Sequence, residues 1–314
     1  NVKVFTACLS ELSEFSQMRE SVLQGRPIGI SGCVDSQKLH MVYGLSDGFP
    51  YKIIANYSDT KAKEMYEDYQ IYDKEVVFLP AKDYIFFQAD IHGNKLTKER
   101  IKVFKKILEG RPLTIVTTFD AFMAPCLPLT TLKENCIFLD KTVVVDENAL
   151  AAKLQKMGYE RCDQVEKGGQ FSIRGGIVDI FDLTEENPVR VELWGDAIES
   201  MRSFDVLSQR SITGLKSVTI YPATEIILSG EEKRRGIEAI EEEAGKVEEA
   251  FRKEFKTEEA ARVRNQIKQF KEQLVEFGTL ANLESYVKYF YNNLVSFLDL
   301  FAESETVLFL DEPV

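Results

Sequence analysis

The chain has 314 residues and a formal net charge of -12, with 39 Lys and Arg against 51 Asp and Glu. This length suits two or three domains better than one. The acidic balance argues against a surface built to neutralise phosphates, because nucleic-acid affinity comes largely from Lys and Arg, so we expect weak DNA binding at most. No run reaches the ~18 uninterrupted apolar residues of a membrane span, and we expect a cytoplasmic protein without a membrane partner.

The first third of the chain alternates strand-like and helix-like patterns, which is typical of a parallel α/β sheet. Short runs that are apolar on both faces predict strands at 28–31, 52–57, 76–79 and 113–117. Apolar residues at helical spacing predict helices at 12–23, 36–45, 60–69 and 97–108. Strands of this kind are expected where helices cover both faces of the sheet. The pattern therefore predicts a RecA-like or Rossmann-like half.

The pattern changes after Pro125 and Pro128. Asp146 is a predicted cap for a helix at 147–157, and four strand candidates follow, FSIRGGIVDIF, VRVELW, AIESMRSF and SVTIYPA. Gly195-Asp196 suits a two-residue hairpin turn. From about residue 223 the chain reads as helical again, through a charged hairpin at 229–276 and an aromatic-rich segment at 283–300, and it ends in an apparent buried strand, VLFLDEPV. We predict three parts: 1–125, 126–222 and 223–314.

A phosphate-binding loop is suggested by ISGCVDSQKL, which follows a predicted strand and opens a predicted helix. The template G-x-x-x-x-G-K-[ST] falls on Gly32, Gln37, Lys38 and Leu39. Gln37 replaces the second glycine and places a side chain where phosphate would approach. Leu39 replaces the hydroxyl that would hold Mg²⁺, and Asp35 adds a repelling charge. The sequence therefore predicts a degenerate nucleotide site and no bound cofactor.

A second candidate is the terminal LFLDEPV, in which an apolar strand ends on Asp311 and Glu312. This arrangement resembles the acidic motif that coordinates Mg²⁺ in nucleotide hydrolases. Without the hydroxyl partner at Leu39 it has nothing to cooperate with, and paired acids at a strand end are also ordinary surface residues. We therefore interpret it as a degenerate acidic motif.

The cysteines do not form a metal motif. Their number is odd, their spacing lacks Cys-x-x-Cys, and the other soft ligands are two histidines. We expect reduced thiols in apolar surroundings and no metal site. The residues concerned are Cys8, Cys33, Cys126, Cys136, Cys162, His40 and His92. No Ser/His/Asp arrangement can be assembled from two histidines, so we expect no catalytic residues.

A third candidate is one face of the antiparallel region. Side chains alternate along a strand, so Arg190 and Trp194 share the face opposite the apolar residues of VRVELW. Arg174 alternates in the same way in FSIR and is predicted to point outward as well. Arginine and tryptophan are enriched at binding hot spots. The alternative is that Trp194, the only tryptophan, packs under a loop or over an arginine stem.

The strings GGQFSIRGGIVDIF, NPVRVELWGDAIESMRSFD, SQRSI and TIYPA closely resemble the UvrB-homology region of the bacterial transcription-repair coupling factors, the Mfd family. Supporting matches are the 28–45 segment, IVTTFDAFM and the closing LFLDEP. The resemblance implies a RecA-like (P-loop NTPase-like) domain interrupted by a small antiparallel β-rich domain, plus a helical hairpin. It also implies an amino-terminal fragment, with the polymerase-binding and translocase domains absent.

In that family the inserted domain resembles the surface by which UvrB binds UvrA. The resemblance implies that Arg174, Arg190 and Trp194 contact UvrA, although relatives more often have Phe or another apolar residue at the last position. RNA polymerase and DNA would be bound through the absent domains. UvrB grips damaged DNA with a long aromatic hairpin. Here only the short segment 81–96 takes its place, so we interpret Tyr84, Phe86 and Phe87 as packing residues.

Two other functions stay open. The enzyme alternative is half of an ATP-dependent DNA helicase, which would need an intact phosphate loop and a second RecA-like domain with its arginine finger. The other is a nonspecific DNA-binding module, which the net charge disfavours.

Overall fold

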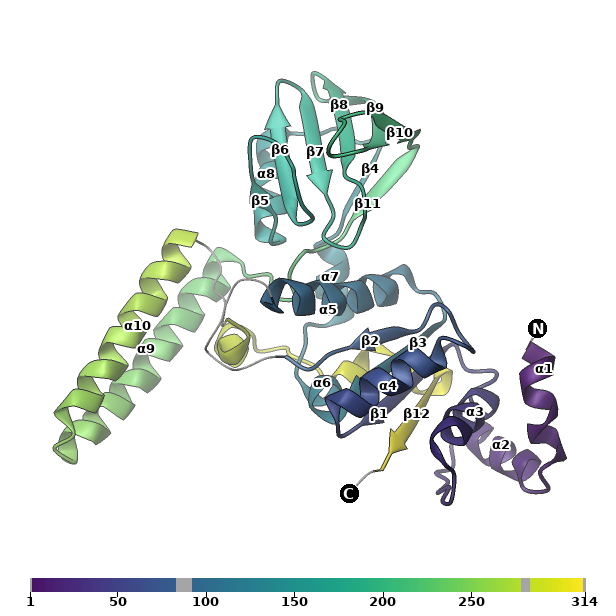
Figure 1. Ribbon diagram of the computed structural model, residues 1–314. Coiled ribbons are helices and arrows are strands. Elements are labelled where there is room, and N and C mark those ends of the chain that lie inside the picture. Colours follow the sequence, from purple (N-terminus) through teal and green to yellow (C-terminus); the bar gives the residue numbers. More distant parts are fainter. Residues whose placement is uncertain (1, 83–91, 278–282, 313–314) are drawn as a thin grey trace. The chain divides into compact units, whose positions relative to one another are not determined.

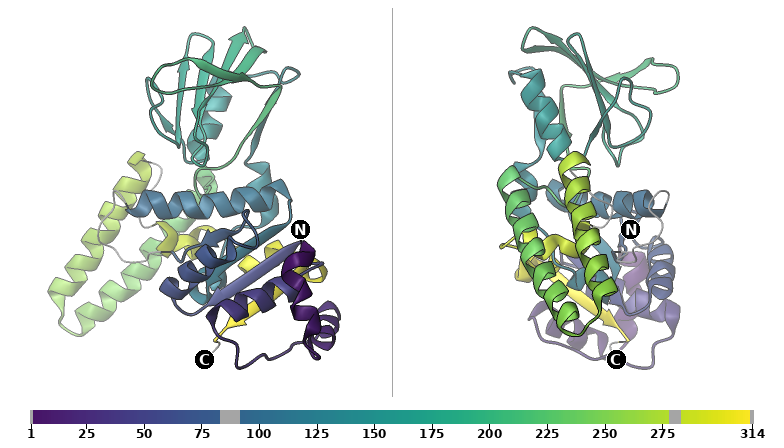
Figure 2. Two further views of the ribbon diagram at one scale, coloured as in Figure 1. Left: turned by 45° about the vertical axis from the view of Figure 1, so that its right-hand side comes forward. Right: turned by 90° about the vertical axis from the view of Figure 1, so that its left-hand side faces the viewer.

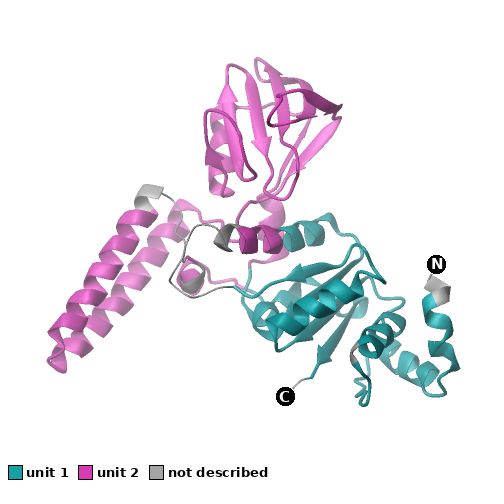
Figure 3. Cartoon of the chain, viewed as in Figure 1, with its two compact units in different colours: residues 1–82, 102–126, 295–314 teal, residues 83–101, 127–294 magenta. Residues whose placement is uncertain are grey.

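The computed structural model describes residues 2–82, 92–277 and 283–312. The chain divides into two compact units, residues 1–82, 102–126 and 295–314 in unit 1 and residues 83–101 and 127–294 in unit 2 (Figure 3). For the longer of the two segments that belong to unit 2, the chain leaves unit 1 after Cys126 and returns to it at Val295. These two residues exchange backbone hydrogen bonds of 3.0 Å in each direction. The two ends of the segment 127–294 are therefore held together by backbone hydrogen bonds within unit 1.

Unit 1 is built on a sheet in which the described strands follow the order β12-β1-β3-β2, with every neighbouring pair parallel (Figure 1). The strands are β1 (Tyr51–Asn56), β2 (Val77–Leu79), β3 (Leu113–Thr118) and β12 (Thr306–Asp311). β2 and β3 are buried along their whole length, as expected where helices cover both faces. On one face Leu39 from α3 (Asp35–Leu45) and Tyr69 from α4 (Asp59–Tyr69) pack against Ile54 and Val116.

The helical elements of unit 1 lie between these strands and at the start of the chain. They are α1 (Val2–Ala7), η1 (Leu9–Glu11), α2 (Phe15–Leu23), α3 (Asp35–Leu45), α4 (Asp59–Tyr69), α6 (Phe119–Met123), η3 (Phe297–Leu300) and η4 (Glu303–Glu305). α5 (His92–Glu109) runs across the division between the units and starts earlier than its apolar spacing predicts. α2 ends as predicted, because Gly25 takes up a left-handed φ of 70° directly after the cap.

Two predicted strands differ from the structure. Residues 28–31 form no strand: Gly29 and Gly32 interrupt the short apolar run, and Ile30 is 42% exposed. The terminal strand does form as β12, but it is an edge strand rather than a buried one. Leu308 and Leu310 on β12 are 37% and 47% exposed. A short apolar run does not reveal whether its strand has neighbours on both sides.

Within unit 2, a six-stranded sheet has the order β10-β9-β8-β7-β6-β5, and its central pairs from β6 to β9 are antiparallel. Its strands are β5 (Glu160–Arg161), β6 (Gln170–Arg174), β7 (Ile177–Phe181), β8 (Val189–Trp194), β9 (Ala197–Phe204) and β10 (Ser211–Gly214). The predicted turn at Gly195 is confirmed, with φ 65°, and Gly175 and Gly176 make the preceding turn with φ of 56° and 81°.

One face of this sheet packs on α8 (Glu147–Lys156) and on a two-stranded sheet of β4 (Ile137–Asp140) and β11 (Ser217–Ile220). The shared core includes Leu154, Phe171, Val178 and Val191. The predicted cap of α8 is confirmed, because the Ala149 amide donates to Asp146 Oδ1 at 2.8 Å. The string SVTIYPA is a strand as predicted, but it pairs with β4.

The charged segment forms two long helices, α9 (Gly230–Lys253) and α10 (Thr257–Phe277), which lie side by side in every view (Figure 2). Ser229 caps α9 through a reciprocal bond with Glu232. The predicted helical segment 283–300 is broken into short pieces, η2 (Leu283–Tyr286), α11 (Val287–Phe290) and η3. The remaining helix of unit 2 is α7 (Leu129–Glu134).

Candidate functional site

The outward face of the six-stranded sheet carries the residues that the sequence singles out. Val189, Val191 and Leu193 of β8 pack into the core, so Arg190 and Trp194 share the opposite face, as alternation predicts. Arg174 of β6 is the cross-strand partner of Ile177 of β7, and Ile177 is in turn the partner of Glu192 of β8. Trp194 lies two residues beyond Glu192, roughly 7 Å along the strand. Arg190, Arg174 and Trp194, the three predicted partner-binding residues, therefore lie in three successive rows of cross-strand partners on this face.

A buried carboxylate, Asp179, holds the two arginines. Asp179 is 1% exposed and lies on β7, directly opposite Arg190 on β8. Arg190 donates from Nε to Oδ1 at 2.7 Å and from Nη2 to Oδ2 at 2.8 Å, and Arg174 Nη2 donates to Oδ2 at 3.3 Å. The hydrogen bonds with Asp179 raise the pKa of Arg190. This geometry is the two-pronged arginine–carboxylate pairing that fixes a guanidinium in one plane.

Arg190 is predicted to point outward as an accessible donor, but in the structure most of its side chain is covered. Its side chain is only 14% exposed, its guanidinium lies 4.3 Å from the ring centroid of Phe204, and Nη2 also donates to Gln209 at 2.9 Å. Of the three guanidinium nitrogens of Arg190, Nε and Nη2 make these hydrogen bonds, and Nη1 makes none with the residues that the structure describes. Arg190 therefore offers one edge to a partner, and most of its donors stabilise the sheet.

Arg174 and Trp194 are the accessible members of the set. The side chain of Arg174 is 49% exposed and makes a single long contact with Asp179. Trp194 is 80% exposed, so the alternative that it packs under a loop or over an arginine stem is wrong. An exposed indole in the row next to that of a half-exposed guanidinium combines two residue types that are enriched at hot spots.

A second ion pair borders this surface, and sequence reasoning missed it. Arg202 on β9 donates to Glu192 at 2.5 Å, and the Ser200 hydroxyl donates to Glu192 at 2.6 Å. These donors, Arg202 foremost, lower the pKa of Glu192 to about 2. The signals for the missed residues were present but weak: Asp179 is the one acid inside the apolar string IVDIF, and Glu192 and Arg202 have the outward parity of their strands.

The segment predicted to be a degenerate nucleotide loop lies in unit 1 at the start of α3. Leu39, which stands where the template has a hydroxyl, is 3% exposed and packs in the core beneath the sheet. Gln37 bonds back to the amide of Val34 at 3.3 Å, so its side chain caps α3. Gly32 keeps a left-handed φ of 82°. Asp35 is the first residue of α3.

Lys38 is paired with the terminal acidic motif, a partnership that the sequence did not suggest. Its Nζ lies 3.1 Å from Asp311 Oδ1 and 2.8 Å from Glu312 Oε1. The bond with Glu312 is the main reason that the pKa of Lys38 is raised. Asn56 at the end of β1 donates to Asp311 Oδ2 at 2.8 Å. The lysine that would meet phosphate is thus neutralised within the chain.

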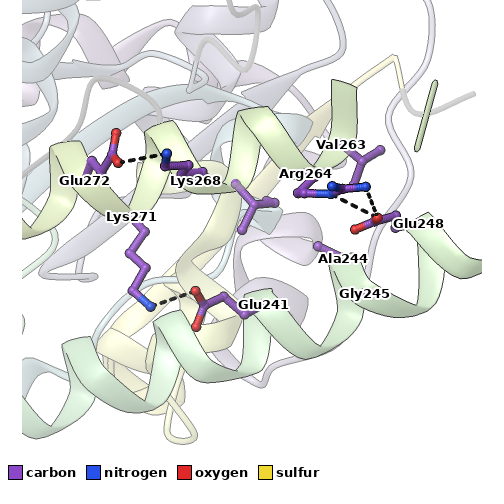
Figure 4. A pocket seen from close by; sticks show the side chains of 10 residues that line it. Glu241, Ala244, Gly245, Glu248, Val263, Arg264, Lys268, Lys271 and Glu272 are labelled. Atoms are coloured by element: carbon purple, nitrogen blue, oxygen red, sulfur yellow. Dashed lines mark hydrogen bonds and ion pairs between the residues drawn. The ribbon is translucent and has the colours of Figure 1, made fainter. Parts of the chain in front are cut away.

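A groove between α9 and α10 is lined in part by Ala244, Gly245 and Val263, and the pairs Lys271–Glu241 (2.8 Å) and Arg264–Glu248 (2.6 Å) join its two helices (Figure 4). Its charges are satisfied by one another, and we assign it no ligand. The predicted packing residues Tyr84, Phe86 and Phe87 lie outside the described residues.

The side chains that could bind a metal, the cysteines and the apolar character of the helices bear on the metal and membrane predictions. Among residues 2–82, 92–277 and 283–312, no cluster of three or more His, Cys, Asp and Glu side chains is arranged for a metal ion. All five cysteines are free, but Cys8 is exposed, so the expectation of apolar surroundings fails for it. In the same part of the chain no helix combines the length and apolar character needed to cross a membrane.

Comparison with known proteins places the surface in a recognised domain. Residues 137–226 match the family model of the UvrB interaction domain. The chain is 34% identical over 241 residues to the transcription-repair-coupling factor of Bacillus subtilis, which covers 76% of this chain and 20% of the relative. It is 28% identical over 268 residues to the UvrABC system protein B of Kosmotoga olearia, with 83% of this chain and 40% of the relative covered.

The coupling factor of Myxococcus xanthus is 28% identical over 240 residues, covering 76% of this chain and 19% of the relative. The chain thus spans about a fifth of the coupling factors and two fifths of the UvrB protein that it matches. The predicted resemblance to the UvrB-homology region of coupling factors is confirmed.

Proposed function

From the UvrB interaction domain at residues 137–226 and the likeness to coupling factors, we propose that this chain is a non-catalytic module that recruits UvrA. It would bring UvrA to a stalled RNA polymerase in transcription-coupled nucleotide excision repair. The observation that carries the proposal is Trp194, 80% exposed and next to the row of Arg174 on the outward face of a sheet inside that domain.

The roles of the three residues follow from their exposure. Trp194 is the apolar anchor, because an exposed indole removes a large apolar area from water when a partner covers it. Arg174 is the main charged donor, since half of its side chain reaches solvent. Arg190 contributes only through Nη1 and mainly keeps the strands in register. The surface therefore suits a partner with an apolar pocket bordered by carboxylates.

Calorimetric titration of purified UvrA with this chain tests the proposal. Trp194→Ala and Arg174→Ala are expected to weaken binding by roughly 1 to 4 kcal/mol each. Arg174→Glu should be worse than Arg174→Ala, because it sets a repulsive charge against an acidic partner group. Arg161→Ala is the matched control: Arg161 is an exposed arginine on β5 of the same sheet. Affinities within a factor of two of wild type for both surface variants would exclude this surface as the site.

We also propose that unit 1 is a RecA-like domain whose nucleotide site has been lost. The supporting geometry is Lys38 paired with Asp311 and Glu312, together with a buried Leu39 in place of the metal-binding hydroxyl. We expect no ATP hydrolysis and no tight nucleotide binding. Micromolar binding of Mg²⁺-ATP, or steady phosphate release that disappears in Lys38→Ala, would favour the helicase alternative instead.

We expect contacts with RNA polymerase and DNA to be made by other domains of the coupling factors, and a cytoplasmic location stays a prediction. For this chain we expect weak DNA binding that fades as salt rises, because a net charge of -12 repels the phosphates. Fluorescence anisotropy with labelled duplex DNA at two salt concentrations measures this. Tight, damage-selective binding at physiological salt would contradict it.

A further inference from the structure

Three exposed apolar residues form a row beside the surface described above. Trp194 at the end of β8 is 80% exposed, Val144 in the loop before α8 is 71% exposed, and Ala197 at the start of β9 is exposed as well. Single exposed apolar side chains are ordinary on protein surfaces. Three that adjoin one another are informative, because a contiguous apolar patch marks an interaction surface.

The strand pairing puts the three side chains in one line. Ala197 is the cross-strand partner of Trp194, and Val144 forms an antiparallel bridge with Ala197 on its other side. Directly paired residues have their Cβ atoms roughly 5 Å apart on the same face. The neighbours Val143 and Val145 pack into the core, so Val144 must point to the outward face that also carries Trp194.

The local backbone holds this row in place. The amide of Val145 donates to the carbonyl of Asp196 at 2.8 Å, which ties the loop to the β8–β9 turn. The next residue, Asp146, caps α8. Gly195 supplies the left-handed turn with φ 65°. An apolar row fixed before binding loses little conformational entropy when a partner covers it.

We propose that Trp194, Ala197 and Val144 form one apolar strip, covered by an apolar ridge of UvrA, with Arg174 at its polar border. The strip rests on the proposed function and extends it to two residues that the sequence motifs did not mark. Its occupant is UvrA because the strip is continuous with the Trp194 anchor and lies inside the matched domain. The adjoining Glu192–Arg202 pair is internally neutral and leaves Arg174 as the charged contact.

Substitutions at Val144 test the strip without disturbing the core. Val144→Asp should weaken UvrA binding about tenfold or more, because it buries a charge against an apolar surface. Val144→Thr keeps the shape and should weaken binding by a few-fold. The matched control is Phe138→Asp: Phe138 is 54% exposed on β4, paired with Thr219 of β11 in the other sheet, and its affinity should stay within twofold of wild type.

The single tryptophan supplies a second readout. With 5-fluorotryptophan in this chain alone, ¹⁹F resonance spectroscopy should show a shift on addition of UvrA. Val144→Asp should require about tenfold more UvrA for the same shift. Thermal melts of the free variants should match wild type, which separates lost contact from lost fold.

The possible results distinguish a failure of the apolar strip from a failure of the proposed function. Weaker binding in Trp194→Ala and Val144→Asp, with Phe138→Asp unchanged, supports the strip. Weaker binding in Trp194→Ala and Arg174→Ala, with Val144→Asp within twofold of wild type, overturns the strip and leaves the proposed function standing. An equal loss in Phe138→Asp also overturns it. If the wild-type chain does not bind UvrA, the proposed function fails and the strip fails with it.

Discussion

Removing Arg190 should damage the fold as well as any interface. Asp179 is 1% exposed and receives two of its three arginine hydrogen bonds from Arg190. In Arg190→Met the carboxylate would keep only the 3.3 Å contact from Arg174. Breaking a buried ion pair by removing one partner costs about 3–5 kcal/mol. Because Arg190 is 14% exposed and Arg174 remains, we expect the lower end, about 3 kcal/mol.

Native-state hydrogen exchange measures this locally. The amides of Val178 and Ile180 lie in β7, and the amide of Val191 lies in β8, all within the core. A loss of about 3 kcal/mol in opening free energy speeds their exchange roughly 150-fold. The double variant Asp179→Leu/Arg190→Met removes both charges, and its protection should return to within about 1 kcal/mol of wild type.

Two results would refute this reasoning. One is exchange in Arg190→Met that rises by less than about fivefold, since that corresponds to only about 1 kcal/mol. The other is a double variant no better protected than the single one. Either would mean that the pair contributes little to the sheet, and a loss of UvrA binding in Arg190→Met could then be assigned to the interface.

Three further predictions concern other parts of the chain. Gly236→Ala should destabilise the packing of α9 by about 1–3 kcal/mol, seen in a thermal melt, because a Cβ there would lie 2.1 Å from the Phe290 ring; an unchanged melt would contradict this. Glu192 has its pKa lowered to about 2, so the stability from its pair with Arg202 should be constant above about pH 5 and be lost as pH falls towards 2. Urea titrations of wild type and Glu192→Gln should therefore converge only at acid pH. Lys38→Met should lower the melting temperature without creating phosphate release, since it leaves two neighbouring carboxylates unneutralised; an unchanged melt would show that the pairs contribute nothing.

Local patterns were sufficient for most elements. The cap at Asp146, the turn at Gly195 and the alternation in VRVELW each depend on residues a few positions apart, and each is present in the structure. The division of the sheet faces followed from the same alternation, because the apolar residues of β8 must enter the core. The sequence therefore located Trp194 on the outward face.

Contacts between residues far apart in the sequence could not be predicted from these local patterns. Lys38 meets Glu312 across 274 positions, and nothing near either residue signals the contact. Whether residues 28–31 gain a strand neighbour, and whether β12 is central or at an edge, depend on which segments the sheet assembles side by side. Hydrogen bonds between strands are made by backbone groups, which carry no sequence signature of their partner.

The exposed fraction of each outward side chain could not be predicted from the sequence. Alternation put Arg190 and Trp194 on the same face, yet one is 14% and the other 80% exposed. The difference comes from Asp179 on the neighbouring strand β7, Phe204 at the end of the neighbouring strand β9 and Gln209 in the loop after it, which together enclose the Arg190 guanidinium. The direction of each side chain could be predicted from the sequence, because direction follows from local backbone geometry. How much of each side chain reaches solvent depends on neighbours that only the folded chain brings together.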